Sequence, residues 1–101
     1  MGIRRSKQEL LQTDLPINDA LKRCDDALSR GGFKNIVKNE TLRHLNGKYK
    51  KITVFGEIDI SLKEIGGKTE INLKSTANVD NIFALFSSPN NKILKAFISN
   101  F

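Results

Sequence analysis

The sequence predicts an α+β fold, a two-layer sandwich in which two helices cover one face of an antiparallel sheet of four to five strands. Two runs in which apolar and polar residues alternate flank Gly66 and Gly67, as in paired half-buried strands. Residues 16–30 and 89–100 carry apolar residues at helical spacing. A sheet with one apolar face and two amphipathic helices must cover one another. The expected order of elements is β-α-β-β-β-β-α.

The N-terminal part of the chain is basic and polar. Residues 1–6, which include Arg4 and Arg5, are expected to form a flexible basic tail. Residues 7–101 are the length of one domain with a modest core. Residues 8–13 are short and of mixed polarity, which predicts an edge strand.

The first helix is expected from Pro16 to Arg30. Proline suits a first helical turn, and Arg30 with Gly31 suits a C-terminal end. Its apolar residues share one stripe, formed by Ile17, Ala20, Leu21, Cys24, Ala27 and Leu28. Cys24 lies in the middle of this stripe, where a thiol behaves as a small core residue and is a poor nucleophile.

The middle of the chain is predicted to form short strands. Residues 33–37 predict a strand, and a turn near residues 39–40 is followed by a short strand over residues 41–45. Asn46 and Gly47 form a strong turn pair, which predicts a hairpin across them.

The clearest register is that of the hairpin at Gly66 and Gly67. If these are the two central turn residues, Ile65 faces Lys68. The apolar and charge patterns then support one alignment, because a slip by one residue spoils both. The paired residues are Leu62 with Ile71, Ile60 with Leu73, Val54 with Val79, Lys63 with Glu70, and Asp59 with Lys74.

The last helix is expected from Pro89 to about residue 100, with Ser88 as its cap. Its apolar face carries Ile93, Leu94, Phe97, Ile98 and Phe101. Residues from both helices and both long strands are predicted to share one core: Leu21, Cys24, Leu28, Ile58, Ile60, Leu73, Leu94 and Phe97.

This element order and the Gly66-Gly67 hairpin resemble small bacterial helix-grip or TATA-binding-protein-like domains, over about residues 8–101. The resemblance implies helices packed on one face of a curved antiparallel sheet. Many such domains have no assigned activity, and helix-grip-like folds often hold a small apolar ligand between helix and sheet. Fold alone does not determine function.

Catalytic and metal chemistry have little support in the sequence. Glu57 and Asp59 lie two residues apart on the outer sheet face, where cross-strand ion pairs explain them better than acid and base catalysis. His44 and Cys24 are the single histidine and cysteine, too few for a zinc site. No catalytic constellation, metal site or cofactor is therefore expected, and the chain is interpreted as non-enzymatic.

Basic residues gather in the middle of a chain whose net charge is +6. Arg43, Lys48, Lys50 and Lys51 are candidate anion-binding residues for nucleic acid or an anionic lipid surface. The alternative is that these charges are solvated and protect strand edges from pairing. Phe55 is expected on the outer face with Tyr49 near it, where it would stack on bases, contact another subunit or be partly covered by the N-terminal segment.

Gly56 falls opposite Ala77 in the predicted register, and Ser75 faces inward beside Ile58. A small pair leaves a hollow in the inner sheet face. Gly56, Ser75 and Ala77 are therefore candidate cavity-lining residues, with the hollow filled either by a helix side chain or by a small apolar ligand.

The remaining candidate is an apolar cluster before the last helix, formed by Ile82, Phe83, Leu85 and Phe86. Incomplete cover would make it an interaction patch, with a homodimer the simplest outcome. The preferred interpretation is thus a non-enzymatic binding or interaction module. A basic-surface binder and a carrier of an apolar ligand are the alternatives. The lack of a membrane-spanning apolar run or secretory signal predicts a cytoplasmic location.

Overall fold

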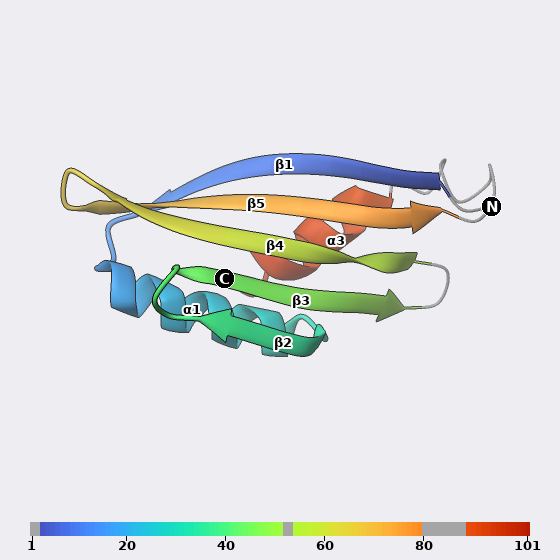
Figure 1. The fold of residues 1–101 in the computed structure, drawn as a ribbon, viewed down its shortest axis with the longest axis horizontal. Helices are drawn as coiled ribbons and strands as arrows, with labels where there is room; N and C mark the ends of the chain where they lie inside the picture. Colours follow the sequence, from blue (N-terminus) through green and yellow to red (C-terminus); the bar gives the residue numbers. More distant parts are fainter. Residues whose placement is uncertain (1–2, 52–53, 80–88) are drawn as a thin grey trace.

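The computed structural model describes residues 3–51, 54–79 and 89–101 (Figure 1). They form an α+β fold in the order that the sequence predicts, β-α-β-β-β-β-α. The elements are β1 (Ile3–Thr13), α1 (Ile17–Arg30), β2 (Lys34–Asn39), β3 (His44–Lys51), β4 (Val54–Ile65), β5 (Lys68–Val79) and α3 (Pro89–Ile98).

The five strands form one antiparallel sheet in the order β1-β5-β4-β3-β2. Strands β1 and β2 lie at its two edges (Figure 1). The pairing of β1 with β5 keeps one register from Ile3 opposite Val79 to Thr13 opposite Thr69. The pairing of β2 with β3 shifts after Lys34. The two edges therefore differ in regularity.

The hairpin between β4 and β5 has the predicted register. Ile65 faces Lys68, and the pairs Ile60 with Leu73 and Asp59 with Lys74 follow. Gly66 and Gly67 have φ angles of 54° and 82°, the left-handed region that glycine adopts without steric cost. The turn chemistry and the apolar alternation thus specify the same alignment.

The helices pack on one face of the sheet, which buries the core between the layers (Figure 1). Helix α1 lies against β2, β3, β4 and β5, and α3 lies against β4, β5 and β1. Neither is long and apolar enough to cross a membrane. The eight predicted core residues are all buried in one cluster: Leu21, Cys24, Leu28, Ile58, Ile60, Leu73, Leu94 and Phe97.

The N-terminal prediction is wrong in its boundary. Strand β1 begins at Ile3, so residues 3–6 belong to the sheet rather than to a flexible tail. The reason is the length of β5, which extends to Val79 and offers backbone partners as far as Ile3.

The predicted strand over residues 41–45 and the hairpin at Asn46 and Gly47 are also wrong. The turn occupies residues 40–43, where the side chain of Asn39 accepts a hydrogen bond from the Leu42 N–H at 3.0 Å. Gly47 lies inside β3 instead. A Cβ there would come within 3.1 Å of Phe33 and 3.3 Å of Leu28, so glycine is needed for close packing rather than for a turn.

Candidate functional site

The predicted hollow at Gly56 is occupied by a helix side chain. Gly56 does face Ala77, and Ser75 and Ala77 are fully buried. A Cβ at Gly56 would lie 2.8 Å from Cδ1 of Ile93 on α3. Gly56 therefore allows the close approach of α3, which is the first of the two interpretations.

Ser75 is buried because it has a polar partner on α3. Its hydroxyl donates a hydrogen bond of 2.6 Å to the side-chain oxygen of Asn90. Both side chains are buried. This bond joins β5 to the first turn of α3, and Ser75 is a structural contact within the described chain.

Three of the four candidate anion-binding residues, Lys48, Lys50 and Lys51, lie together at one end of β3, and Arg43 lies apart from them. Arg43 belongs to the turn before β3, whereas Lys51 ends this strand of eight residues. A strand of that length spans about 26 Å. Lys48 forms an ion pair with Glu57, and the ammonium of Lys50 lies 5.8 Å from the centre of the Phe55 ring. The three lysines thus lie at the end of β3 that is distant from Arg43.

The expected nearness of Tyr49 to Phe55 is wrong. Tyr49 faces the helix-covered side, where its ring centre lies 5.1 Å from that of Phe33 and only 8% of the residue is exposed. Phe55 pairs with Lys50 and lies on the opposite face, because neighbouring residues of a strand alternate. Of these two rings, only that of Phe55 lies on the outer face.

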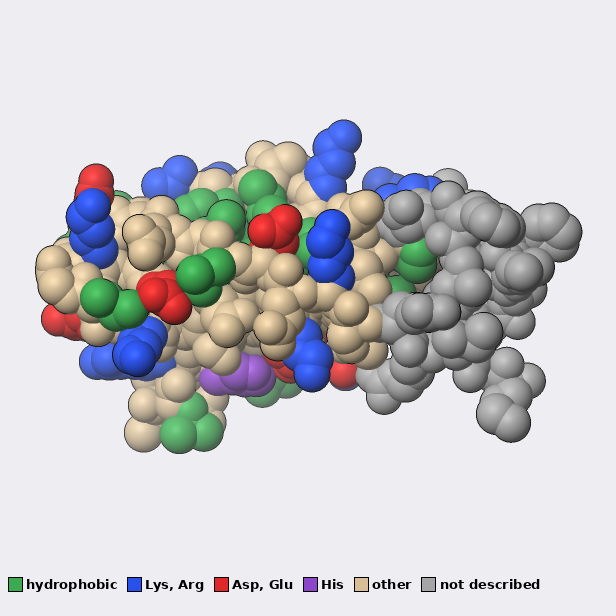
Figure 2. Space-filling model, turned by 90° about the horizontal axis from the view of Figure 1, so that it is seen from above, with side chains coloured by type: hydrophobic (Ala, Val, Ile, Leu, Met, Phe, Trp, Pro, Cys, Tyr) green, Lys and Arg blue, Asp and Glu red, His purple; other side chains and the backbone are tan. Residues whose placement is uncertain are grey.

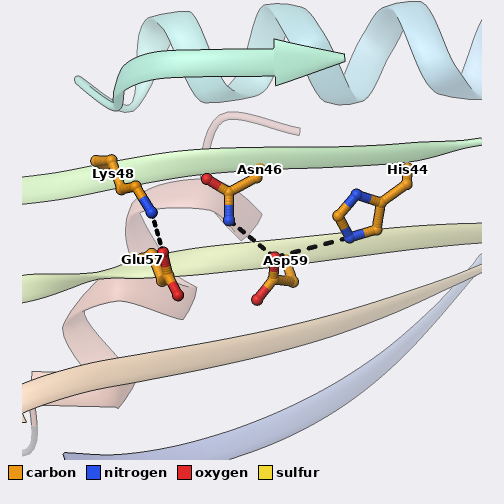
Figure 3. A network of polar contacts seen from close by, with 5 residues as sticks. All are labelled: His44, Asn46, Lys48, Glu57 and Asp59. Atoms are coloured by element: carbon orange, nitrogen blue, oxygen red, sulfur yellow. Dashed lines mark hydrogen bonds and ion pairs between the residues drawn. The ribbon is translucent and has the colours of Figure 1, made fainter. Parts of the chain in front are cut away.

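The outer face carries a polar network between β3 and β4 (Figure 3). Asn46 donates a hydrogen bond of 2.8 Å to Asp59, and Nε2 of His44 lies 3.7 Å from the same carboxylate oxygen. The carboxylate of Glu57 forms an ion pair with the ammonium group of Lys48. The contacts of Asp59 therefore come from β3, although its register partner on β5 is Lys74 as predicted. Cross-strand pairing explains both carboxylates.

The Cys24 thiol lies buried in the core. Burial raises the pKa of the Cys24 thiol to about 12, and nearby Arg23 lowers it only in part. The neutral thiol is a poor nucleophile. Among the described residues, no three His, Cys, Asp or Glu side chains gather as a metal ion would need. The predicted patch of Ile82, Phe83, Leu85 and Phe86 lies outside the described residues.

The predicted edge strand over residues 8–13 is confirmed, and it is longer than predicted, because β1 covers Ile3–Thr13. This strand of eleven residues pairs with β5 on one side, and no described strand pairs with the other. Residues 6–10 are all exposed, and 55% of Leu10 is exposed. Mixed polarity predicted the edge position, but no local signal extended the strand back to Ile3. The other edge strand is six residues long, with an irregular register and Asn35 at a φ of 50°.

A groove runs between this edge and helix α3. Lys7 donates a hydrogen bond of 2.6 Å to the side-chain oxygen of Asn91 beside it. The groove is lined by Glu9, Asn91, Leu94, Lys95, Ile98 and Ser99. Figure 2, which looks onto the molecule from the β1 side, shows hydrophobic, basic and acidic side chains interspersed. We refer to residues 3–13 and this groove as the β1 edge.

Comparison with known proteins supports the fold. No protein-family model matches the chain, and no curated protein sequence matches it. Among solved structures, the chain is similar to CalU16 from Micromonospora echinospora, a structural-genomics target, with a TM-score of 0.55 and 15% identity. The match covers 98% of this chain and 87% of that one. At this identity the likeness shows a shared α+β architecture.

Proposed function

We propose that this protein is a non-catalytic interaction module that binds an extended protein segment by strand addition at the β1 edge. The observation that carries the proposal is a strand of eleven residues with one unbroken register, whose second side is paired by no strand of the described residues. Such a strand presents a row of backbone N–H and C=O groups that a second strand can satisfy.

The contrast between the two edges supports this choice. Natural sheets protect their edges by short strands, bulges and charges. Strand β2 has two of these protections, six residues and an irregular register, whereas both edges carry charges, Lys34 and Lys38 on β2 and Lys7 and Glu9 on β1. Strand β1 is longer and regular. An added strand would therefore find more continuous pairing at β1 than at β2.

The groove supplies a basis for selectivity. In strand addition the main chain contributes affinity, and side chains at alternate positions select the partner. Leu94 is 3% exposed and Ile98 is 39% exposed, so the groove is lined by one buried and one exposed apolar side chain. Glu9 and Lys95 add charges of opposite sign. A segment with apolar and charged residues at alternate positions would fit it.

The two alternative functions have less support. A basic-surface binder would use Lys48, Lys50 and Lys51, but Lys48 is paired with Glu57, Lys50 lies over the Phe55 ring, and Arg43 is at the other end of β3. A carrier of an apolar ligand would need the space over Gly56, which Ile93 occupies. The proposed module requires neither feature.

A displayed library of random peptides tests the proposal. Peptides selected on the natural chain are counter-screened on two edge variants, Lys7→Pro and Gln8→Pro. Alternate residues of an antiparallel strand direct their N–H groups to opposite sides, so one of these prolines blocks the free side without removing a bond to β5. Unchanged thermal unfolding identifies that variant.

We expect enriched peptides to bind the natural chain and to lose binding to the edge-blocked variant. Hydrogen exchange should show added protection in residues 3–13 on binding. Failure to enrich any peptide, or equal binding to the edge-blocked variant, would contradict the proposed function.

A further inference from the structure

We propose that the segment added at the β1 edge is strand β1 of a second copy, antiparallel and related by a twofold axis through Gln8. The two sheets would then form one continuous sheet of ten strands, twice the five of one chain. This inference rests on the proposed function and names its partner. The same surface patch serves both copies, as a twofold interface requires.

The length of β1 favours this centre. Gln8 is the midpoint of Ile3–Thr13. An axis there sets Ile3 of one copy opposite Thr13 of the other, so every residue of the strand has a partner. A centre at Leu10 would pair only residues 7–13 of each strand and leave the rest of the edge free.

The alternation of faces restricts the axis further. Residues directly opposite one another in an antiparallel pair point to the same face. A twofold axis normal to the sheet must therefore pass midway between one residue and the same residue of the other copy. An axis at Lys7 or Glu9 would set that charge against its own copy, and one at Ser6 would pair only residues 3–9 of each strand. Like charges directly opposite destabilise a sheet. Gln8 avoids all three disadvantages.

The Gln8 register places opposite charges together. Lys7 of each copy faces Glu9 of the other, which gives two complementary pairs. Both residues are exposed and pair with buried residues of β5, Lys7 with Ser75 and Glu9 with Leu73, so they share the helix-covered face. A charge that points to this face of an edge strand opposes pairing with an unrelated strand. A second copy in this register supplies the opposite charge and so removes the opposition.

The groove fits the same partner. Glu9 lines it with Leu94 and Ile98, and Lys7 contacts Asn91 at its border. The two α3 helices would flank the joined strands on one face and bring exposed Ile98 towards the new interface. Pairing of one strand is a small contact by the standards of permanent interfaces. We therefore expect a weak, reversible dimer.

Sedimentation over micromolar to millimolar concentrations tests the inference with charge variants. Lys7→Glu sets a second carboxylate against Glu9 of the other copy, and Glu9→Lys sets a second ammonium group against Lys7. Each single variant should raise the dissociation constant at least about tenfold, because two attractive pairs become repulsive. An equal mixture of the two should form a heterodimer, and the double swap should restore the homodimer. Lys92→Glu, which makes the same charge change at an exposed site on α3, should dimerise like the natural chain.

The outcomes separate this inference from the proposed function. If the natural chain stays monomeric while selected peptides bind at residues 3–13, the self-pairing is refuted and strand addition stands. If the natural chain dimerises but the single variants do so equally, the dimer uses another surface and the inference fails. If there is neither a dimer nor peptide binding, both proposals fail. Thermal unfolding of each variant controls for loss of fold.

Discussion

The hydroxyl of Ser75 on β5 donates a hydrogen bond of 2.6 Å to the side-chain oxygen of Asn90 in the first turn of α3. Both groups are buried, so the bond links the two layers from within. We expect Ser75→Ala to lower the free energy of unfolding by about 1 kcal/mol. A double-mutant cycle with Asn90→Ala, measured by urea unfolding, should show coupling of the two losses. Strictly additive losses would show that this bond does not contribute to stability.

The glycine at position 56 should resist enlargement. A Cβ there would overlap the carbonyl oxygen of Thr76 and lie 2.8 Å from Cδ1 of Ile93. Gly56→Ala should cost about 1 to 3 kcal/mol by overpacking. Because Ile93→Val removes the Cδ1 methyl group, the double variant should lose less than the sum of the two single losses. Equal stability of Gly56→Ala and the natural chain would show that α3 lies farther from β4.

Burial should decide the cost of shortening a leucine. Leu94 on α3 is 3% exposed, and Leu42 in the turn before β3 is 73% exposed. Leu94→Ala should cost about 2 to 5 kcal/mol through lost burial and a residual cavity. Leu42→Ala, the matched control, should change stability by less than about 0.5 kcal/mol. Chemical denaturation measures both. A loss below about 1 kcal/mol at Leu94 would be too small for a core position.

The Cys24 thiol should make stability depend on alkaline pH. Its folded pKa is raised by burial from 9.0 to about 12. The unfolded state therefore releases a proton first, so this contribution is fully present below about pH 9 and is lost as the pH rises towards 12. Stability of the natural chain should fall faster between these values than that of Cys24→Ala. Parallel pH profiles of the two proteins would contradict the buried thiol.

The turn between β4 and β5 should discriminate between its two glycines. Their φ angles are 54° for Gly66 and 82° for Gly67. Asparagine suits the first central position of such a turn, so Gly66→Asn should leave the melting temperature almost unchanged. Gly67→Ala should cost about 1 to 2 kcal/mol, because an L side chain is strained in the left-handed region. A neutral effect of Gly67→Ala would mean that the turn has another conformation in solution.

Several elements are predictable from sequence because their signals are local. The stripe from Ile17 to Leu28 specifies α1, and the alternation on either side of Gly66 and Gly67 specifies the register of β4 with β5. Helical and strand periods differ, so each pattern supports one backbone conformation. The position of Gly56 opposite Ala77 follows from that register alone.

Tertiary packing overrode local propensity in β3. Asn46 and Gly47 are a strong turn pair by composition, yet they continue the strand. Gly47 lies where Phe33 and Leu28 leave no space for a side chain. The cost of a Cβ there depends on residues distant in the chain, which a local pattern does not encode.

By itself, then, the sequence determined the two helices, the hairpin register and most of the core, whereas the tertiary structure decided the sheet order and the site. The hydroxyl groups of Ser6 and Thr76 lie 3.2 Å apart across a separation of 70 residues, in keeping with the place of β1 beside β5. No other strand among residues 3–51, 54–79 and 89–101 pairs with the second side of β1. Backbone hydrogen bonds are chemically alike whichever strands they join. The mixed polarity of residues 8–13 therefore predicted an edge strand without revealing its neighbour, and the full length of this edge is decided only when the whole chain is folded.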